Sequence, residues 1–139
     1  MSRTVVLGYD ASDGAKAALA KTIEIARRDT AKVVIVFGYE IPAAYGGETG
    51  DYRRAVRSIG EQAAADAVER MAESGVDYET ELVAKRPAEG LVSVAEERGA
   101  DMIIVGSHGE HPLAGAILGS VPHKLLHLSH VPVLVVPSR

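Results

Sequence analysis

Cysteine is absent from the 139-residue sequence, and so is tryptophan. Without cysteine the chain has no disulfide, no thiolate metal site and no thiol nucleophile, and nothing in it indicates an oxidising compartment. Long apolar runs are also missing, since none approaches the roughly 18 residues of a membrane-spanning helix. The apolar run Val5–Leu7 is too short for a signal peptide and is soon followed by Asp10. We therefore expect a cytoplasmic protein that does not bind a membrane.

An excess of positive charge is lacking as well. Fifteen lysines and arginines stand against nineteen acidic residues, which gives a formal net charge of -4. Because a mildly acidic surface does not attract a polyanion, duplex nucleic acid is not an expected partner. Hydrophobic residues make up 47% and charged residues 24%, as in ordinary globular domains. The length fits one domain, which we place at residues 1–139.

Short apolar segments rich in β-branched residues predict five strands. They are Val5–Leu7, Val33–Phe37, Tyr78–Val83, Met102–Val105 and Val131–Val136. All except Tyr78–Val83 are nearly continuous in their apolar character, which is typical of parallel strands covered on both faces. Polar and apolar residues alternate more in Tyr78–Val83, so this strand is expected nearer an edge of the sheet.

Segments with helical periodicity separate the predicted strands. They are Ser12–Arg28, Asp51–Ser74, a helix from Pro87 that Gly99 closes, and a helix that begins near Ser120 and ends before Pro132. Ser12 or Asp13 is a candidate N-cap of the first helix, and Gly75 is expected to stop the second. The inward stripe of the second helix is predicted to be Ala55, Ile59, Ala63, Ala67 and Met71. The alternation of strands and helices predicts an α/β fold, a three-layer, doubly wound parallel sheet of five strands.

Two glycine-containing segments follow each other late in the chain. Val105-Gly106-Ser107-His108-Gly109 comes directly after a predicted strand, and Gly119-Ser120-Val121 begins a predicted helix. Ligands of doubly wound sheets bind at the carboxyl ends of the strands, where both segments should lie. Gly106 and Gly109 let the backbone approach a ligand closely. The amides of Gly119, Ser120 and Val121 are expected to be free at the positive end of the helix. Together they predict a cradle for phosphate oxygens.

Asp10 follows the first predicted strand and should lie beside the glycine segments if the first and fourth strands are neighbours. Its carboxylate can accept hydrogen bonds from ribose hydroxyls or a base amine, or help to hold a divalent cation. Asp10 can equally serve as an N-cap of the first helix. Ser120 carries the same alternative, although capping and phosphate binding are compatible.

The spacing of these residues resembles a known pattern. Gly106 and Gly109 are separated by two residues, and nine residues separate Gly109 from Gly119 and Ser120. ATP-binding members of the universal stress protein family carry the same spacing, with glycine followed by serine or threonine at its end. The aspartate in Tyr9-Asp10-Ala11-Ser12 and the final apolar strand through Val136 extend the resemblance over essentially the whole chain.

The resemblance implies a Rossmann-like fold of the adenine nucleotide alpha hydrolase-like type, with strand order 3-2-1-4-5. It also implies a stress-response or signalling protein that holds ATP between the first and fourth strands. If Mg²⁺ accompanies the ATP, the carboxylate chemistry of Asp10 makes it the candidate to help hold the ion. The residues implied at the nucleotide are Tyr9, Asp10, Ala11, Gly38, Val105, Gly106, Ser107, His108, Gly109, Gly119, Ser120 and Val121. Family members typically form homodimers through the last strand, here Val131–Val136, whose apolar edge would favour association if left unpaired.

Two segments depart from the family pattern. Many members have glycine where this chain has Ala11, and many have glycines shortly before the proline that opens the third helix, where this chain has Ala84-Lys85-Arg86-Pro87. Neither departure affects the phosphate cradle. Either is expected to alter contacts with the base or the ribose.

Several ionisable residues have two interpretations. His123, His127 and His130 have a helical spacing that could gather a metal, but no local carboxylate supports them, and we favour ordinary helix positions. His108 and His111 either flank the phosphates or are solvated. Lys124 follows the cradle by one turn and is expected to be a surface lysine rather than a phosphate ligand.

Three functions remain open from the sequence. The favoured one is a nucleotide-binding module. The second is an enzyme of the same architecture, although fast phosphoryl transfer is not predicted because the chain has no phosphate-loop lysine and no clear base. The third is a dimeric interaction module that holds no nucleotide. The glycines at 106, 109 and 119 argue against the third function, because bulkier residues would be expected at these positions if no ligand had to fit beside them.

Overall fold

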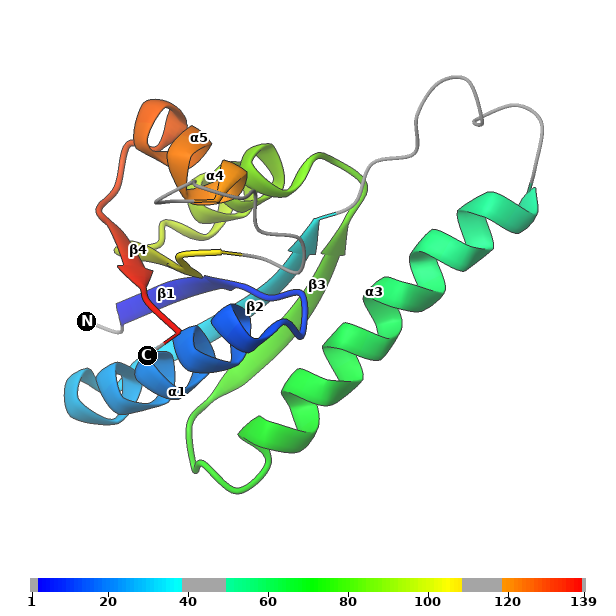
Figure 1. Ribbon diagram of the computed structural model, residues 1–139. Coiled ribbons are helices and arrows are strands. Elements are labelled where there is room, and N and C mark those ends of the chain that lie inside the picture. The colour runs from blue at the N-terminus through cyan, green and yellow to red at the C-terminus, as the bar shows by residue number, and fades with distance from the viewer. Residues whose placement is uncertain (1–2, 39–49, 109–118, 139) are drawn as a thin grey trace.

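The computed structural model describes residues 3–38, 50–108 and 119–138. Five parallel strands form one sheet in the order β3-β2-β1-β4-β5 (Figure 1). Their bounds are β1 Arg3–Gly8, β2 Ala31–Gly38, β3 Tyr78–Val83, β4 Met102–Gly106 and β5 Val133–Val136. The parallel sheet predicted from the apolar segments is confirmed, and so is the strand order implied by the resemblance.

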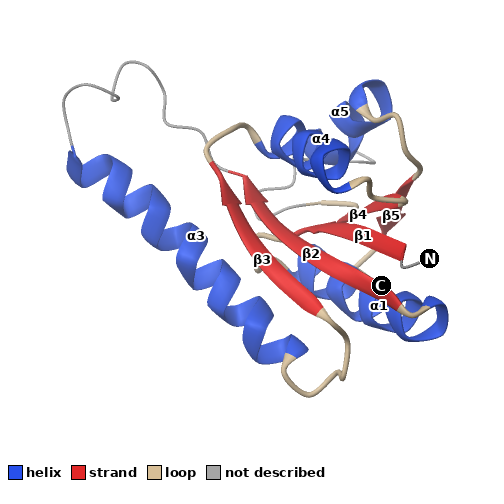
Figure 2. Ribbon diagram, turned by 180° about the vertical axis from the view of Figure 1, so that it is seen from behind, coloured by secondary structure: helices blue, strands red, loops and turns tan. Residues whose placement is uncertain are grey.

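Helices cover both faces of the sheet and make a three-layer architecture (Figures 1 and 2). The helices are α1 Asp13–Asp29, α3 Gly50–Met71, α4 Pro87–Arg98 and α5 Ser120–Leu128. Residues of α1 and α3 share one core with one face of the strands, and residues of α4 and α5 share a second core with the other face. No helix in the described ranges is long and apolar enough to cross a membrane.

Burial on both faces explains why the central strands are apolar at nearly every position. Val5 and Leu7 of β1 pack in the core under α1 and α3, whereas Val6 packs in the core under α4 and α5. In β2, Val34 lies on the α4 side and is fully buried. Continuous apolar runs therefore mark strands between two helical layers.

Local hydrogen bonds set most helix ends near their predicted positions. Ser12 caps α1, because its hydroxyl oxygen accepts from the Ala15 N–H at 3.2 Å. Gly99, with φ of 60°, closes α4 as predicted. The predicted end of α3 at Ser74 is wrong: α3 ends at Met71, because the Ser74 N–H and hydroxyl both donate to the Met71 carbonyl in a turn.

The last strand is shorter than predicted. It begins at Val133 rather than at Val131. The Ser129 hydroxyl donates to the Val131 carbonyl at 2.7 Å and accepts from the Val131 N–H at 3.1 Å. This local turn satisfies the backbone N–H and carbonyl of Val131, so the pairing of β5 with β4 begins only at Val133.

The predicted inward stripe of α3 is confirmed only in its second half. Ala63, Ala67 and Met71 are buried, whereas Ala55 and Ile59 are exposed. Figure 2 shows the reason: the N-terminal half of α3 diverges from the edge strand β3. The apolar periodicity of the sequence therefore extends over the whole of α3, although only the C-terminal half of the helix packs on the sheet.

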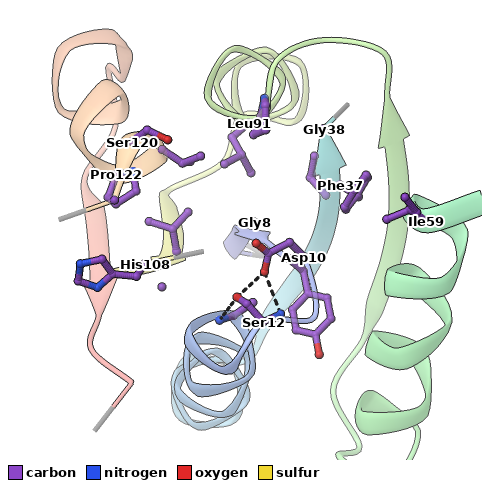
Figure 3. A pocket seen from close by; sticks show the side chains of 18 residues that line it. Gly8, Asp10, Ser12, Phe37, Gly38, Ile59, Leu91, His108, Ser120 and Pro122 are labelled. Carbon is purple, nitrogen blue, oxygen red and sulfur yellow. Dashed lines mark hydrogen bonds between the residues drawn. The ribbon is translucent and has the colours of Figure 1, made fainter. Parts of the chain in front are cut away.

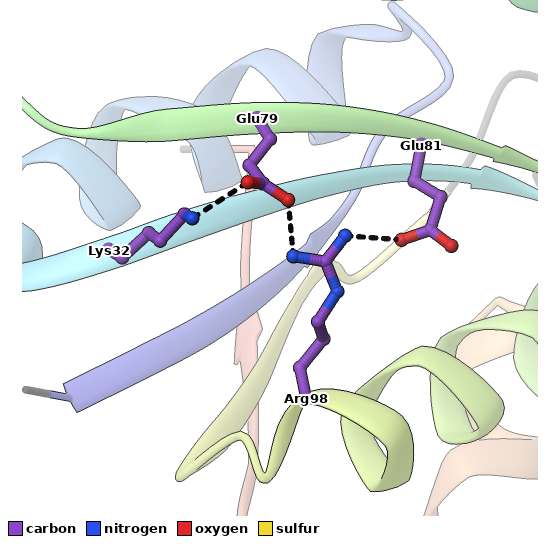
Figure 4. A network of polar contacts seen from close by, with 4 residues as sticks. All are labelled: Lys32, Glu79, Glu81 and Arg98. Atoms are coloured by element: carbon purple, nitrogen blue, oxygen red, sulfur yellow. Dashed lines mark hydrogen bonds and ion pairs between the residues drawn. The ribbon is translucent and has the colours of Figure 1, made fainter.

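A charged cluster links the edge strand to the rest of the molecule (Figure 4). Lys32 of β2 bonds Glu79 of β3 at 2.7 Å, and Arg98 of α4 bonds both Glu79 and Glu81. The hydrogen bond from Lys32, followed by that from Arg98, holds the pKa of the Glu79 carboxyl below its usual value. These partly exposed ion pairs stabilise the sheet modestly. Through them Arg98 connects α4 to the edge strand β3.

The start of α1 touches the end of β4 through backbone alone. A Cβ atom at Gly14 would lie 2.2 Å from the His108 carbonyl oxygen, and one at Gly106 would lie 2.5 Å from the Gly14 carbonyl carbon. Neither position can carry a side chain without moving backbone. Glycine at both positions therefore lets α1 begin directly beside the end of β4.

We predict opposite effects for alanine at two helical glycines. Gly14→Ala should destabilise the protein by about 3 kcal/mol, because the added carbon meets rigid backbone. Gly90→Ala is the matched control: its Cβ would contact nothing nearer than 3.5 Å, and alanine gains up to about 1 kcal/mol of helix propensity. Urea denaturation of both variants measures the difference, and equal stability of the two would contradict the close approach.

Candidate functional site

A cavity of about 370 Å³, called the pocket below, opens at the carboxyl ends of β1, β2 and β4 (Figure 3). The predicted site residues that line it are Tyr9, Asp10, Gly38, Val105, Gly106, His108, Gly119, Ser120 and Val121. Ala11 and Ser107 are not among the residues that line the pocket. Gly109 and His111, which were also considered, lie outside the described residues. The structure thus brings the two glycine-containing segments and Asp10 to one place.

Sequence reasoning missed half of the pocket lining. The missed residues are Gly8, Ser12, Ala15, Val36, Phe37, Ile59, Pro87, Leu91 and Pro122. Gly8, Val36 and Phe37 end strands, and Pro87 begins a helix after a strand, so their positions at the carboxyl edge of the sheet could have predicted them. Nothing in the sequence pattern marked Ile59, which was expected to face the core.

The turn between β1 and α1 holds Asp10 in place. Oδ1 of Asp10 accepts from the Ser12 N–H at 3.0 Å and from the Ser12 hydroxyl. Ser12 is therefore both the cap of α1 and the anchor of Asp10, so the alternative that Asp10 itself caps the helix is wrong. Ala11 between them has φ of 64°, the left-handed region that favours glycine. The departure from the family pattern at Ala11 thus leaves backbone strain in this turn.

Backbone hydrogen bonds hold the end of β4 and the residue before α5 together. The Ser107 N–H donates to the Val136 carbonyl at 2.9 Å, and the Gly119 N–H donates to the Ser107 carbonyl at 2.6 Å. The expectation that the Gly119 amide is free is therefore wrong. This hydrogen bond fixes the start of α5 against the end of β4.

The first turn of α5 presents its N–H groups at the pocket. Gly119 is the N-cap residue and has no side chain to bond these groups. Ser120 and Val121 are the first two helical residues, whose N–H groups have no carbonyl acceptor within the helix. Both residues line the pocket, and the positive end of the helix dipole lies there. This end of the pocket is suited to an anion.

Asp10 is the acidic side chain of the described pocket lining, and the groups there that can donate to an anion come mainly from the backbone. Among the described residues that line it, none is lysine or arginine. Lys124, one turn into α5, is paired with Glu89 of α4 at 3.4 Å. Any anion in the pocket would therefore be met chiefly by the α5 amides rather than by a cationic side chain.

Known proteins are similar to this chain over nearly its whole length. The model of the universal stress protein family matches residues 1–137. The chain belongs to the universal stress protein family. A universal stress protein of Thermus aquaticus is 34% identical, with 98% of this chain and 99% of that protein covered.

Solved structures of similar proteins agree. The structure of protein MJ0577, of Methanocaldococcus jannaschii, superposes with a TM-score of 0.87 at 25% identity, and the alignment covers 99% of this chain and 96% of that protein. A universal stress protein solved in complex with cAMP is 32% identical, with a TM-score of 0.72 and coverage of 99% and 98%. The architecture of this universal stress protein is thus common to its relatives.

The histidines of α5 do not form the helical triplet that their spacing suggested. His123 and His127 lie edge to face with ring centroids 5.3 Å apart. The helix ends at Leu128, so His130 lies beyond it. Across the described part of this universal stress protein, no three histidine, aspartate or glutamate side chains are grouped to hold a metal.

A buried tyrosine links the pocket to α3. Tyr9 is 4% exposed, and its hydroxyl donates to Oδ2 of Asp66, which also accepts from Nε of Arg70 at 3.0 Å. Burial, and then the bond to Asp66, raise the pKa of Tyr9 well above its ordinary value. The same bond, followed by that from Arg70, lowers the pKa of the Asp66 carboxyl. The neutral phenol and the ionised carboxylate are therefore the forms that the fold stabilises.

This pair predicts a pH-dependent stability difference for Tyr9→Phe. At pH 7 the variant should lose about 1.5 kcal/mol, the contribution of a hydrogen bond to a charged group. The pKa of Tyr9 in the folded protein is raised above the unfolded value of 10.0. The contribution of Tyr9 to the free energy of unfolding is therefore complete below pH 10 and is lost as the pH rises further. The Asp66 contribution is lost as the pH falls below 3.8, because its folded pKa is lowered.

Urea denaturation across this pH range measures the difference between wild type and variant. The control is Tyr9→Phe in an Asp66→Asn background, where the pH dependence at both ends should shrink. A difference that is constant from pH 3 to pH 11 would contradict the assignment of the pair.

Proposed function

We propose that this chain is a cytoplasmic stress-response module, one domain over residues 1–139, that binds ATP or a related adenine nucleotide in the pocket. The observation that carries the proposal is the arrangement of the pocket's two ends. One end presents the N–H groups of Ser120 and Val121 at the start of α5, and the other is formed by apolar residues around Gly38. A ligand with a polyanionic tail and a flat apolar ring matches both.

The phosphates are placed at the start of α5. A helix N-terminus favours negative charge through both its unpaired N–H groups and its dipole. Gly119 adds no side chain to that side of the pocket, and Gly106 lets the backbone of α1 begin beside it. The Ser120 hydroxyl would add one more donor to a phosphate oxygen.

The ribose is placed beside Asp10 and the base beside Gly38. The Asp10 carboxylate is held by Ser12 at the middle of the pocket (Figure 3), where it can accept from ribose hydroxyls. A relative at 32% identity was solved in complex with cAMP, which supports an adenine nucleotide as the class of ligand. Magnesium would arrive with the phosphates, with Asp10 as a protein ligand, since the described residues form no metal cluster of their own.

Binding rather than rapid turnover is the proposed role. Efficient phosphoryl transfer requires cationic groups that stabilise charge in the transition state, and no lysine or arginine is among the described residues that line the pocket. A slow ATPase activity is compatible with this proposal, because weak hydrolysis does not need that clamp.

The chain is also proposed to form a homodimer through its last strand. β5 lies at an edge of the sheet, and Val133, Leu134 and Val135 remain partly exposed. The Pro132 carbonyl accepts from the Ile103 N–H of β4, and the Val136 carbonyl accepts from the Ser107 N–H just beyond β4. By alternation the Val135 N–H therefore points away from the sheet. This leaves a donor for a second copy of the strand.

Light scattering should give twice the 14.6 kDa chain mass. Val135→Pro should give the monomer mass, because it removes the outward donor at an edge where proline is tolerated. A monomeric wild type, or a variant that stays dimeric, would contradict pairing through β5.

ATP should raise the melting temperature of the protein. At a concentration 100 times its Kd, a ligand bound only to the folded state adds about 2.7 kcal/mol, or roughly 8 °C for a domain of this size. Gly119→Val should abolish the shift by placing a side chain where the phosphates bind. Gly90→Ala, another glycine substitution but outside the pocket lining, should keep it.

Differential scanning fluorimetry at millimolar ATP and magnesium measures this shift in melting temperature. No shift in the wild type would favour an interaction module that holds no nucleotide. A shift that survives in Gly119→Val would mean that the ligand binds elsewhere.

A further inference from the structure

We propose that Ile59 of α3 is a specificity-determining residue that contacts the purine ring of the bound nucleotide. This inference rests on the proposed function and goes beyond the glycine-containing segments, because it assigns a role to a helix on the opposite side of the pocket. The structural starting point is that, among the described residues of α3, Ile59 alone lines the pocket (Figure 3).

The exposure of Ile59 is unusual for its position. The large hydrophobic residues exposed in the described part of the chain are Ile59, Val68, Leu126 and Leu128. Of these four, Ile59 alone lines the pocket, and 57% of it is exposed. A ligand that covers this side chain would remove apolar surface from water, which stabilises the bound state in proportion to the area covered.

The backbone next to Ile59 is held against the sheet. A Cβ atom at Gly60 would lie 2.7 Å from Cδ2 of Leu82 and 2.8 Å from Cδ1 of Phe37. The helix therefore approaches β2 and β3 as closely as glycine permits at this point. Phe37 also lines the pocket, so the same contact that seats α3 places Ile59 beside Phe37.

A second attachment fixes α3 farther along. The hydrogen bond from Tyr9 to Asp66 joins the helix to the residue before Asp10. With Gly60 and Asp66 both attached, the backbone that carries Ile59 is held beside the pocket. A wall held in this way selects ligands by shape rather than adapting to them.

The chemistry of this end of the pocket points to an uncharged planar ring. Ile59, Phe37 and Gly38 lie together at this end (Figure 3), and the Pro87 backbone approaches Gly38 closely. These groups offer apolar surface and no side-chain charge, which suits a heteroaromatic base. A purine presents more apolar surface than a pyrimidine and should be preferred. The α5 end of the pocket binds the phosphates of every nucleotide alike.

The test separates the base from the phosphates with two probes, ATP and inorganic tripolyphosphate. Isothermal titration calorimetry on the full chain should show that Ile59→Ala weakens ATP binding about tenfold, since truncation removes three carbons that the ring would partly cover. Tripolyphosphate binding should change less than twofold. Because Ile59 is exposed without ligand, the variant should fold as the wild type does, which circular dichroism verifies.

Two further variants make the result specific. Val68→Ala truncates another exposed residue of α3, away from the pocket lining, and should change neither affinity. Ile59→Leu keeps the apolar volume and should restore ATP binding to within threefold. The preference of the wild type for ATP over CTP should also shrink in Ile59→Ala.

The outcomes distinguish this inference from the function on which it rests. If the wild type binds ATP and Ile59→Ala binds it equally well, the role of Ile59 is wrong while nucleotide binding stands. Equal weakening of ATP and tripolyphosphate would also overturn it, because Ile59 would then shape the whole pocket. A wild type that binds neither probe overturns the proposed function itself.

Discussion

The close backbone contact between the start of α1 and the end of β4 is the constraint on which the pocket depends. Gly14 approaches the His108 carbonyl and Gly106 so closely that neither glycine has room for a Cβ atom. This contact keeps the turn that carries Asp10 beside the segment that leads to α5. Ser107 then bonds both β5 and Gly119, so the end of β4 also fixes the first turn of α5. The carboxylate and the helix amides thus face one cavity because one strand end positions both.

The opposite wall of the pocket is built differently. Helix α3 lies beyond β2 and contacts the sheet closely at Gly60, and the Tyr9–Asp66 hydrogen bond ties it to the end of β1. Rigid backbone therefore surrounds the end of the pocket at α5, whereas a helix attached at separate points lies at the apolar end. This division matches the proposed ligand, whose phosphates need fixed donors and whose base needs a fitted apolar surface.

The sequence predicted the fold well because apolar continuity, caps and glycine spacing are local signals. Gly99 ended α4 and Ser12 capped α1 as expected. Contacts between distant segments were not predictable in the same way. Gly106 looked like a ligand-facing residue, yet its missing side chain is required by α1. The Gly119 amide looked free but bonds Ser107, and Ile59 looked buried because helical periodicity cannot show where the sheet below α3 ends.

The most direct test of the central claim is to follow each backbone amide by nuclear magnetic resonance while ATP is added. We predict that the amide resonances of Ser120 and Val121 shift together with that of Gly38, all with one saturation curve. Such a result would place one ligand across both ends of the pocket. Shifts confined to other faces of the molecule, or separate curves for the two ends, would contradict it.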